Sequence, residues 1–215
     1  MNIGILGSGD VGRSLGRGLA AKGHTVMIGS RTPGKPELAE WRKAAGAKAS
    51  TGTFAQAAAH GELLVLATNG AATEAAIDLA GAKNFADKVV IAVTNPLDVS
   101  QRAPPGLFVG TSDSLGERIQ RKLPKARVVK TLNIVSNATM VNPRMKDGLP
   151  DMMVAGDDAG AKRVVAGLLK DFGWPEPIDV GGIDGARWLE AMVPLWVRVC
   201  QSVGTWTVAW RILRS

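Results

Sequence analysis

Three glycines near the start of the chain have a spacing that can bind phosphate groups. The letters "GSGDVG", from Gly7 to Gly12, read G-x-G-x-x-G, and they lie between an apolar run at residues 2–6 and a helical pattern at residues 10–22. A strand before this motif and a helix after it form the context of a dinucleotide-binding turn, in which the helix N-terminus donates N–H groups to a pyrophosphate. The predicted contacts are Gly7, Ser8, Gly9, Asp10, Val11 and Gly12. A tight turn without a ligand is the alternative interpretation.

The end of the next strand identifies the kind of dinucleotide. About 20 residues beyond such a motif, an enzyme that binds NAD places an acidic residue against the ribose 2′-hydroxyl. This chain instead has Ser30 and Arg31, with Lys35 a few residues later. An arginine can pair with a 2′-phosphate through two parallel hydrogen bonds, whereas an acid would repel it. The sequence therefore predicts NADP(H), held by Ser30, Arg31 and Lys35. A surface turn and a solvated lysine are the alternatives.

The elements that must position these residues alternate between strands and helices. Apolar runs predict strands at residues 2–6, 25–28, 63–67, 89–93, 128–132, 152–155 and 178–180. Helical patterns cover residues 10–22, 38–45, 71–79, 114–123, 159–172 and 184–213. This alternation indicates an α/β Rossmann fold with a doubly wound, mostly parallel sheet and a small C-terminal β-α extension that ends in a long apolar helix. We expect an NADP-binding domain at residues 1–150 and, at residues 151–215, an extension that completes the sheet, borders the acceptor cleft and contacts a second subunit.

Polar residues follow several of the expected strands. In an open α/β sheet, ligands bind beyond the carboxyl ends of the strands. Thr68 and Asn69 come after one strand, Asn95 and Pro96 after the next, and Asn133 after the third. We expect these residues to border the nicotinamide, although threonine and asparagine are also common in ordinary turns.

Residues for acid–base or metal chemistry are scarce in this sequence. There is no tyrosine, the two histidines lie in positions typical of surface residues, and Cys200 is the single cysteine. No cluster has the spacing of metal ligands, so we predict no metal site and assign no catalytic residue. The large helical domain that supplies acid and base groups in hydroxyacid and imine reductases is also missing. Hydride transfer between two cofactors needs mainly positioning, which this chain can provide.

Charge and hydropathy exclude several other classes of protein. The net charge is +7 with a pI near 9.9, but the basic residues are dispersed except at residues 117–127, which argues against nucleic-acid binding. The longest uncharged run in the apolar C-terminal stretch, residues 199–210, is too short to span a membrane. The chain begins with a strand pattern and shows no signal peptide. We expect a cytoplasmic protein.

Several segments together resemble the F420-dependent NADP oxidoreductase family, and more closely its short bacterial branch. The segments are the first 35 residues with the glycine motif and Ser-Arg, "VVKTLNIVSNATMVNP", "DMMVAGDDAGAKRVVAGLLKDFGW" and "DVGGIDGARWLEAMVPLW". The nucleotide domains of the STEAP metalloreductases are more distant relatives. The resemblance implies a homodimer that passes hydride between NADPH and the deazaflavin ring of coenzyme F420. It also implies that Asn95, Pro96 and Leu97 lie near the nicotinamide and that residues 133–138 surround the deazaflavin.

Alternatives remain for the second substrate. Asn69, Gly70 and Ala71 stand where the deazaflavin reductases place a proline and an aromatic residue. A planar electron acceptor, F420 first and a flavin such as FMN or FAD second, is the leading hypothesis. A non-catalytic NADP(H)-binding sensor or regulatory module is the alternative. Reduction of a small carbonyl or imine is a third, which the missing helical domain disfavours.

Overall fold

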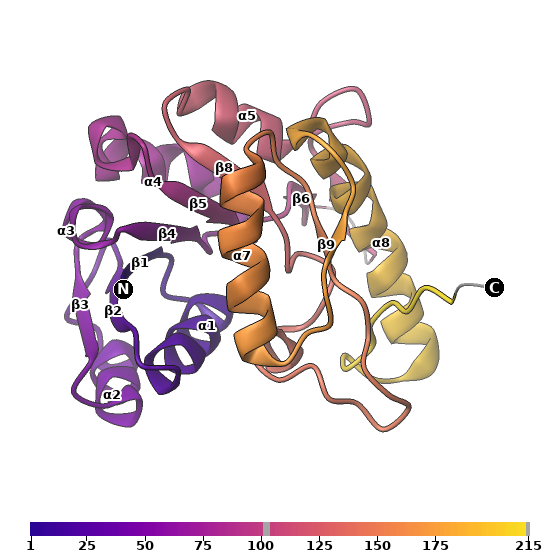
Figure 1. The fold of residues 1–215 in the computed structure, drawn as a ribbon, viewed down its shortest axis with the longest axis horizontal. Helices are drawn as coiled ribbons and strands as arrows, with labels where there is room; N and C mark the ends of the chain where they lie inside the picture. The colour runs from indigo at the N-terminus through magenta and orange to yellow at the C-terminus, as the bar shows by residue number, and fades with distance from the viewer. Residues whose placement is uncertain (101–103, 214–215) are drawn as a thin grey trace.

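A six-stranded parallel sheet forms the centre of the molecule (Figure 1). The computed structural model describes residues 1–100 and 104–213. The strands of the sheet lie in the order β3-β2-β1-β4-β5-β8, and all neighbours are parallel. Their bounds are β1 (Asn2–Leu6), β2 (Thr25–Gly29), β3 (Ala49–Gly52), β4 (Leu63–Leu66), β5 (Val89–Ala92) and β8 (Arg127–Lys130). From β1 the chain adds β2 and β3 on one side, and it then returns to add β4, β5 and β8 on the other side. The expected doubly wound sheet is therefore confirmed, and its switch point lies between β1 and β4.

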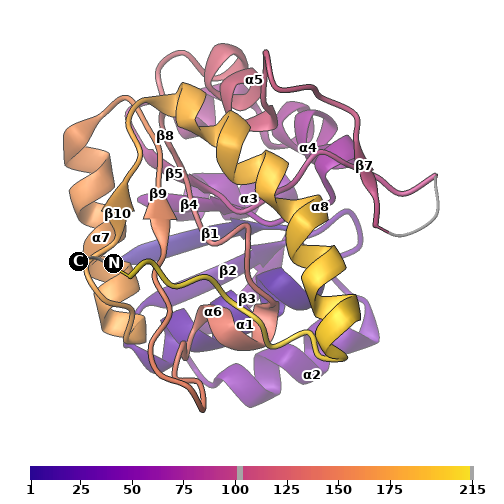
Figure 2. The same ribbon diagram turned by 90° about the vertical axis from the view of Figure 1, so that its right-hand side faces the viewer.

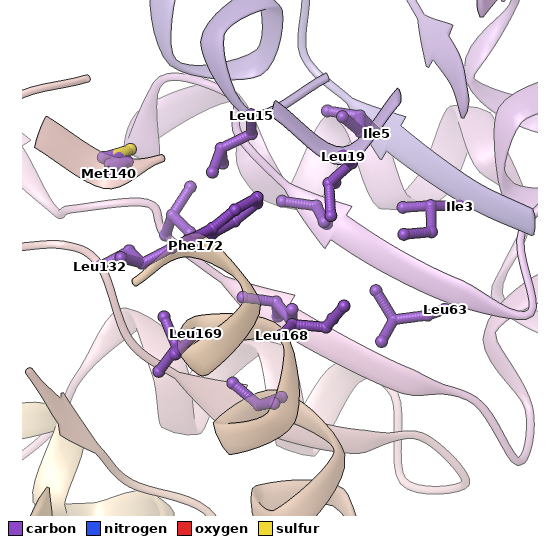
Figure 3. Close-up of a cluster of buried hydrophobic side chains, with 14 of the residues drawn as sticks. Ile3, Ile5, Leu15, Leu19, Leu63, Leu132, Met140, Leu168, Leu169 and Phe172 are labelled. Carbon is purple, nitrogen blue, oxygen red and sulfur yellow. The ribbon is translucent and has the colours of Figure 1, made fainter. Parts of the chain in front are cut away.

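Helices cover both faces of the sheet. One face packs against α1 (Asp10–Ala21), α2 (Pro36–Ala45) and α7 (Ala159–Phe172), and the other against α3 (Phe54–His60), α4 (Thr73–Ala80) and α5 (Leu115–Lys122). The alternation of side chains along a strand divides the core: Ile3 and Ile5 point to the first face, where Figure 3 shows them with Leu15, Leu19 and Leu168, and Leu6 points to the second. Both faces are therefore dry, which explains why the strand sequences lack polar alternation.

The C-terminal part of the chain adds a smaller layer. Strands β9 (Met153–Val154) and β10 (Ile178–Asp179) form a parallel two-stranded sheet, which is joined to the main sheet by one antiparallel bridge between Lys130 and Ala155. Helix α8 (Ala186–Val203) lies beyond the carboxyl ends of the central strands, as the two views show (Figures 1 and 2). The boundary near residue 150 between two domains stays a prediction.

Short elements connect these layers. They are the 3-10 turns η1 (Gly70–Ala72), η2 (Ala82–Phe85) and η3 (Ile183–Gly185), the hairpin strands β6 (Leu97–Asp98) and β7 (Gly106–Leu107), and α6 (Asn137–Met140). Helix α6 packs against α1, and η1 follows the carboxyl end of β4. The connections after β4, β5 and β8 thus meet at one edge of the sheet.

Two sequence expectations about the elements were wrong. The segment between α2 and β4 contains a strand, β3, and a helix, α3, that the sequence analysis missed, because "ASTG" and "FAQAAAH" are small-residue stretches without a clear period. Helix α3 is instead specified by a capping box between Thr53 and Gln56. The final helix was expected to run to residue 213 but ends at Val203, because Gly204 takes the left-handed conformation (φ +76°) that terminates helices.

The surface of α8 is less covered than its composition predicts. Trp188 is 60% exposed and Leu195 is 55% exposed, and both lie on the side of the helix that faces away from the core. The homodimer predicted from this helix stays a prediction. Among the described residues, no helix combines the length and the hydropathy that crossing a membrane requires.

Candidate functional site

The glycine motif forms a turn that only small residues can make. Gly7 has φ +130°, and its N–H donates to the carbonyl of Gly29 at 3.1 Å, which holds the turn against the end of β2. A Cβ at Gly7 would lie 2.3 Å from the carbonyl oxygen of Ala67, and a Cβ at Gly12 would lie 2.0 Å from that of Gly7. A Cβ at Gly9 would meet no atom within 4 Å. Gly7 and Gly12 are therefore required by the fold, whereas Gly9 leaves open space above the loop.

The N-terminus of α1 faces that open space. Gly9 is the N-cap residue, and no side chain hydrogen-bonds to the first N–H groups of the helix. The carboxylate of Asp10 forms an ion pair with Arg13 one turn along the helix. This pairing offsets the negative charge of Asp10 close to the place where a phosphate would bind, so the helix dipole keeps its attraction for anions.

A cavity of about 320 Å³ lies beside the glycine turn. It is bordered by the carboxyl ends of β1, β2 and β4. Ser30 is buried, and its Oγ accepts hydrogen bonds from Ser8 Oγ and from the N–H of Thr32, each at 3.2 Å. Ser30 therefore joins the glycine turn to the loop after β2.

The charge around this cavity is positive. Arg31 and Lys35 line it, and within residues 1–100 and 104–213 no acidic residue does. Arg31 is exposed, and the described part of the chain offers its guanidinium no carboxylate within 4.0 Å. The N–H donors of Arg31 are therefore available to a phosphate group. No acidic side chain among the described lining residues would repel that phosphate.

Sequence reasoning missed an apolar wall of this cavity. It consists of Phe54, Ala72, Ala75, Ala76 and Leu79, from α3 and the η1–α4 segment. Leu79 is 59% exposed although it belongs to a helix with a buried face, but this exposure is visible only in the structure, so the sequence carried no signal for the wall. Apolar side chains at this position can cover one face of a planar ring.

Side-chain amide groups tie the ends of β5 and β8 together, and the loop after β4 packs against them. Asn95 donates from Nδ2 to the carbonyl of Asn133 at 2.8 Å, and Asn133 donates from Nδ2 to Asn95 Oδ1 at 2.9 Å and to the carbonyl of Leu189 at 2.8 Å. A Cβ at Gly70 would lie 1.9 Å from the carbonyl oxygen of Asn95, so the loop after β4 packs directly on the loop after β5. Asn133 thereby connects this edge of the sheet to helix α8.

The structure brings most of the predicted site residues to one edge of the sheet. The first cavity gathers eight of them: Gly7, Ser8, Gly9, Ser30, Arg31, Lys35, Thr68 and Asn69. Asp10, Val11 and Gly12 form the first turn of α1, while Asn95, Pro96, Leu97 and Asn133 lie outside this cavity at the neighbouring strand ends. Asn69 caps η1, where its Oδ1 accepts the N–H of Ala71 at 3.0 Å. The cofactor contacts of all these residues stay predictions.

A buried ion pair lies behind the strand ends, and sequence reasoning did not find it. Lys130, at the end of β8, is 0% exposed and lies 2.8 Å from Glu190, which is 2% exposed. Lys130 also donates to the carbonyl of Thr94, and the Glu190 carboxylate accepts the N–H groups of Leu115 (2.8 Å) and Gly116 (3.0 Å). Burial lowers the pKa of Lys130, and the neighbouring Glu190 carboxylate opposes that shift.

A second ion pair strengthens the same junction. Arg187, on α8, donates two hydrogen bonds to the carboxylate of Glu117, on α5. The Arg187 guanidinium holds the pKa of Glu117 below its ordinary value, and Ser114 adds a hydrogen bond in the same direction. The two pairs fix α8 against α5 and β8, and therefore fix the helix that borders the strand ends.

Metal binding has no candidate in this part of the molecule. Within residues 1–100 and 104–213, no group of three or more histidine, cysteine, aspartate or glutamate side chains is arranged to hold a metal ion.

The three glycines give a prediction that separates folding from binding. Gly9→Ala is expected to change the free energy of unfolding by less than about 1 kcal/mol, because its Cβ would enter open space at a helix N-cap. Gly12→Ala is expected to cost about 1 to 3 kcal/mol, because its Cβ would overlap the carbonyl of Gly7. Urea unfolding and NADPH titration of both variants check this. Gly9→Ala should fold normally and lose NADPH affinity; normal affinity in that variant would contradict the role of the loop.

Comparison with known proteins places the chain in a family. The family model described as "NADP oxidoreductase coenzyme F420-dependent" matches residues 2–96, which include the glycine turn and the loop after β2. A crystal structure from Arthrobacter sp. FB24, of a protein assigned as an F420-dependent NADP-reductase, is 42% identical with a TM-score of 0.95 and covers 100% of both chains. The chain belongs to the F420-dependent NADP oxidoreductase family. It is therefore an NADP(H)-dependent oxidoreductase.

Two curated relatives show how far this family assignment extends. The F420-dependent NADP reductase of Methanocaldococcus jannaschii is 29% identical over 210 residues and covers 91% of this chain and 90% of that protein. The rat metalloreductase STEAP3 is 30% identical over 205 residues, but this chain spans only 37% of its length. Relatives of this chain are thus named for different acceptors, and family membership alone leaves the acceptor open.

Proposed function

We propose that this family member transfers hydride between NADPH and a planar acceptor, with coenzyme F420 the first candidate and a flavin such as FMN or FAD the second. In this proposal Ser30, Arg31 and Lys35 hold the 2′-phosphate of NADPH, and the glycine turn holds the pyrophosphate. The loops that begin at Thr68, Asn95 and Asn133 border the nicotinamide. NADPH, when bound, supplies the hydride.

The main support for NADP(H) as the cofactor is the cavity beside the glycine turn. Two cations line it, no acidic side chain does, and an uncapped helix N-terminus faces the same space. These features fit a dinucleotide with an additional phosphate on its ribose, because each of them attracts anions. The apolar wall from α3 and α4 fits the adenine ring.

The acceptor side supports a reaction that needs positioning and little else. The side chains at the strand ends are hydroxyl and amide groups, such as Thr68, Asn95 and Asn133, which neither gain nor lose protons near neutral pH. The hydrogen bonds between Asn95 and Asn133, and between Thr68 and Thr73, make this edge rigid. A rigid edge can hold two flat rings in contact, and the proton that accompanies a hydride to the acceptor can come from water.

An acceptor panel tests the proposal. The purified protein should oxidise NADPH in the presence of F420 or FMN, and NADH should support a much lower rate at the same concentration. The measurement is the loss of NADPH absorbance with F420, FMN, FAD and simple ferric chelates, which are included because STEAP3 is named a metalloreductase. Absence of turnover above background with every acceptor, in a protein that binds NADPH, would instead favour the non-catalytic NADP(H)-binding module.

A further inference from the structure

A second cavity, larger than the one beside the glycine turn, lies next to helix α6. Its volume is about 710 Å³, and it is formed between residues 142–150 and residues 203–211, with Ala138 and Thr139 of α6 as a third wall. It shares no lining residue with the cavity beside the glycine turn. Figure 2 shows the chain after α8 running back across this face of the molecule. The function proposed above makes no use of this cavity.

Both long walls of this cavity are held in place by hydrogen bonds. The N–H of Asp151 donates to the carbonyl of Trp210 at 2.9 Å, and the Asp151 carboxylate accepts the N–H of Ile212 at 2.7 Å. Trp196 of α8 donates from Nε1 to the carbonyl of Val208 at 2.8 Å. The chain end is therefore attached both to α8 and to the segment after residue 150, and the cavity between them has a defined shape.

The cavity carries excess positive charge. Among the residues that the structure describes, three cations line it, Arg144, Lys146 and Arg211, against one acidic residue, Asp147. All four are exposed, and within the described residues none of the three cations has a carboxylate within 4.0 Å. Leu149 and Val203 add apolar surface to the same walls. Cations beside apolar surface suit an organic anion, such as a phosphate ester or a carboxylate on an aliphatic chain.

Helix α6 connects this cavity to the proposed reaction site. Asn137, its first residue, donates from Nδ2 to Ser14 Oγ of α1 at 3.1 Å, while the next two residues line the cavity. The segment between β8 and α6 contains Asn133, which lies at the carboxyl end of β8. A ring that lies against residues 133–138 would therefore have the basic cavity at one end.

We propose that this cavity binds the anionic side chain of the hydride acceptor. This inference rests on the proposed function, which supplies the planar ring of the acceptor. It adds that the preferred acceptors carry a phosphate or carboxylate group on a flexible chain. Arg144 and Lys146 bind that group and Asp147 opposes it. A planar acceptor without an anionic side chain binds more weakly at this site.

FMN and riboflavin provide the test, because they differ by one phosphate group. Binding is measured by flavin fluorescence with saturating NADP⁺ present, so that the glycine turn is occupied and cannot hold the flavin phosphate. FMN should bind about 10-fold more tightly than riboflavin, the size expected for one charge-assisted contact at an exposed site. In Arg144→Ala/Lys146→Ala the preference should fall to near one, and in Asp147→Asn it should increase.

Matched variants identify the site. Lys43→Ala removes an exposed lysine on α2 that lines neither cavity, and it should leave the preference unchanged. Equal binding of the two flavins by the wild-type protein, or a preference that survives Arg144→Ala/Lys146→Ala, would overturn the inference. The binding experiment needs no turnover. It can therefore fail while NADPH oxidation succeeds, or succeed while the proposed reaction fails.

Discussion

Arg31→Ala is expected to weaken NADPH binding by about 1 to 3 kcal/mol, roughly 5-fold to 150-fold, and to leave NADH binding nearly unchanged. The two nucleotides differ only in the 2′-phosphate. The guanidinium of Arg31 lines the cavity at the end of β2, where no lining residue is acidic. A charged hydrogen bond to a phosphate is lost with NADPH and has no counterpart with NADH.

The measurement is a fluorescence titration of wild type and variant with both nucleotides at fixed ionic strength. Arg163→Ala is the matched control, because Arg163 is an exposed arginine on α7 that lines neither cavity. The control should leave both dissociation constants unchanged. Equal losses of affinity for NADPH and NADH in Arg31→Ala would show that Arg31 does not bind the 2′-phosphate.

Glu190→Leu is expected to lower the free energy of unfolding by about 3 to 5 kcal/mol, a large part of the stability of an ordinary domain. The substitution leaves the ammonium group of Lys130 buried without its partner, and it removes the acceptor for two N–H groups at the start of α5. Helix α8 loses its main polar attachment to the sheet at the same time. The loss should therefore exceed that of any exposed ion pair in the chain.

Urea unfolding checks this expectation, with two further variants for comparison. Glu176→Ala breaks the exposed pair with Lys170 and should cost less than about 1 kcal/mol. The double variant Lys130→Met/Glu190→Leu removes both charges and should recover most of the stability that Glu190→Leu loses, because no buried charge remains. A double variant no more stable than the single one would show that packing and the two unpaired N–H groups, and not the uncompensated lysine, determine the cost.

The predicted residues that the structure brings to one cavity are specified by short stretches of chain. Gly7 has a positive φ and Gly12 packs on the carbonyl of Gly7 within the same turn, and Arg31 lies just beyond the end of the strand that follows. The doubly wound sheet was predictable for a similar reason, since a buried parallel strand shows itself as an uninterrupted apolar run. Each of these features depends on residues close together in sequence.

The parts that were missed depend on contacts between distant segments. Lys130 and Glu190 are each a single charge in an apolar stretch, and only the fold shows that the two meet. Phe54 and Leu79 form a cavity wall because α3 and α4 lie side by side, and the small-residue sequence of α3 shows no helical period. The basic cavity likewise needs residues 142–150 and the chain end to meet. The charges alone, dispersed along the chain, looked like an ordinary solvated surface.

The most direct test of the binding mode is a crystal structure of the protein with NADPH. We expect the 2′-phosphate within about 3 Å of the Arg31 guanidinium and the pyrophosphate at the N-terminus of α1, above Gly9. A dinucleotide bound elsewhere, or an Arg31 side chain turned toward solvent while the 2′-phosphate lies free of it, would contradict the proposed binding mode and the reaction built on it.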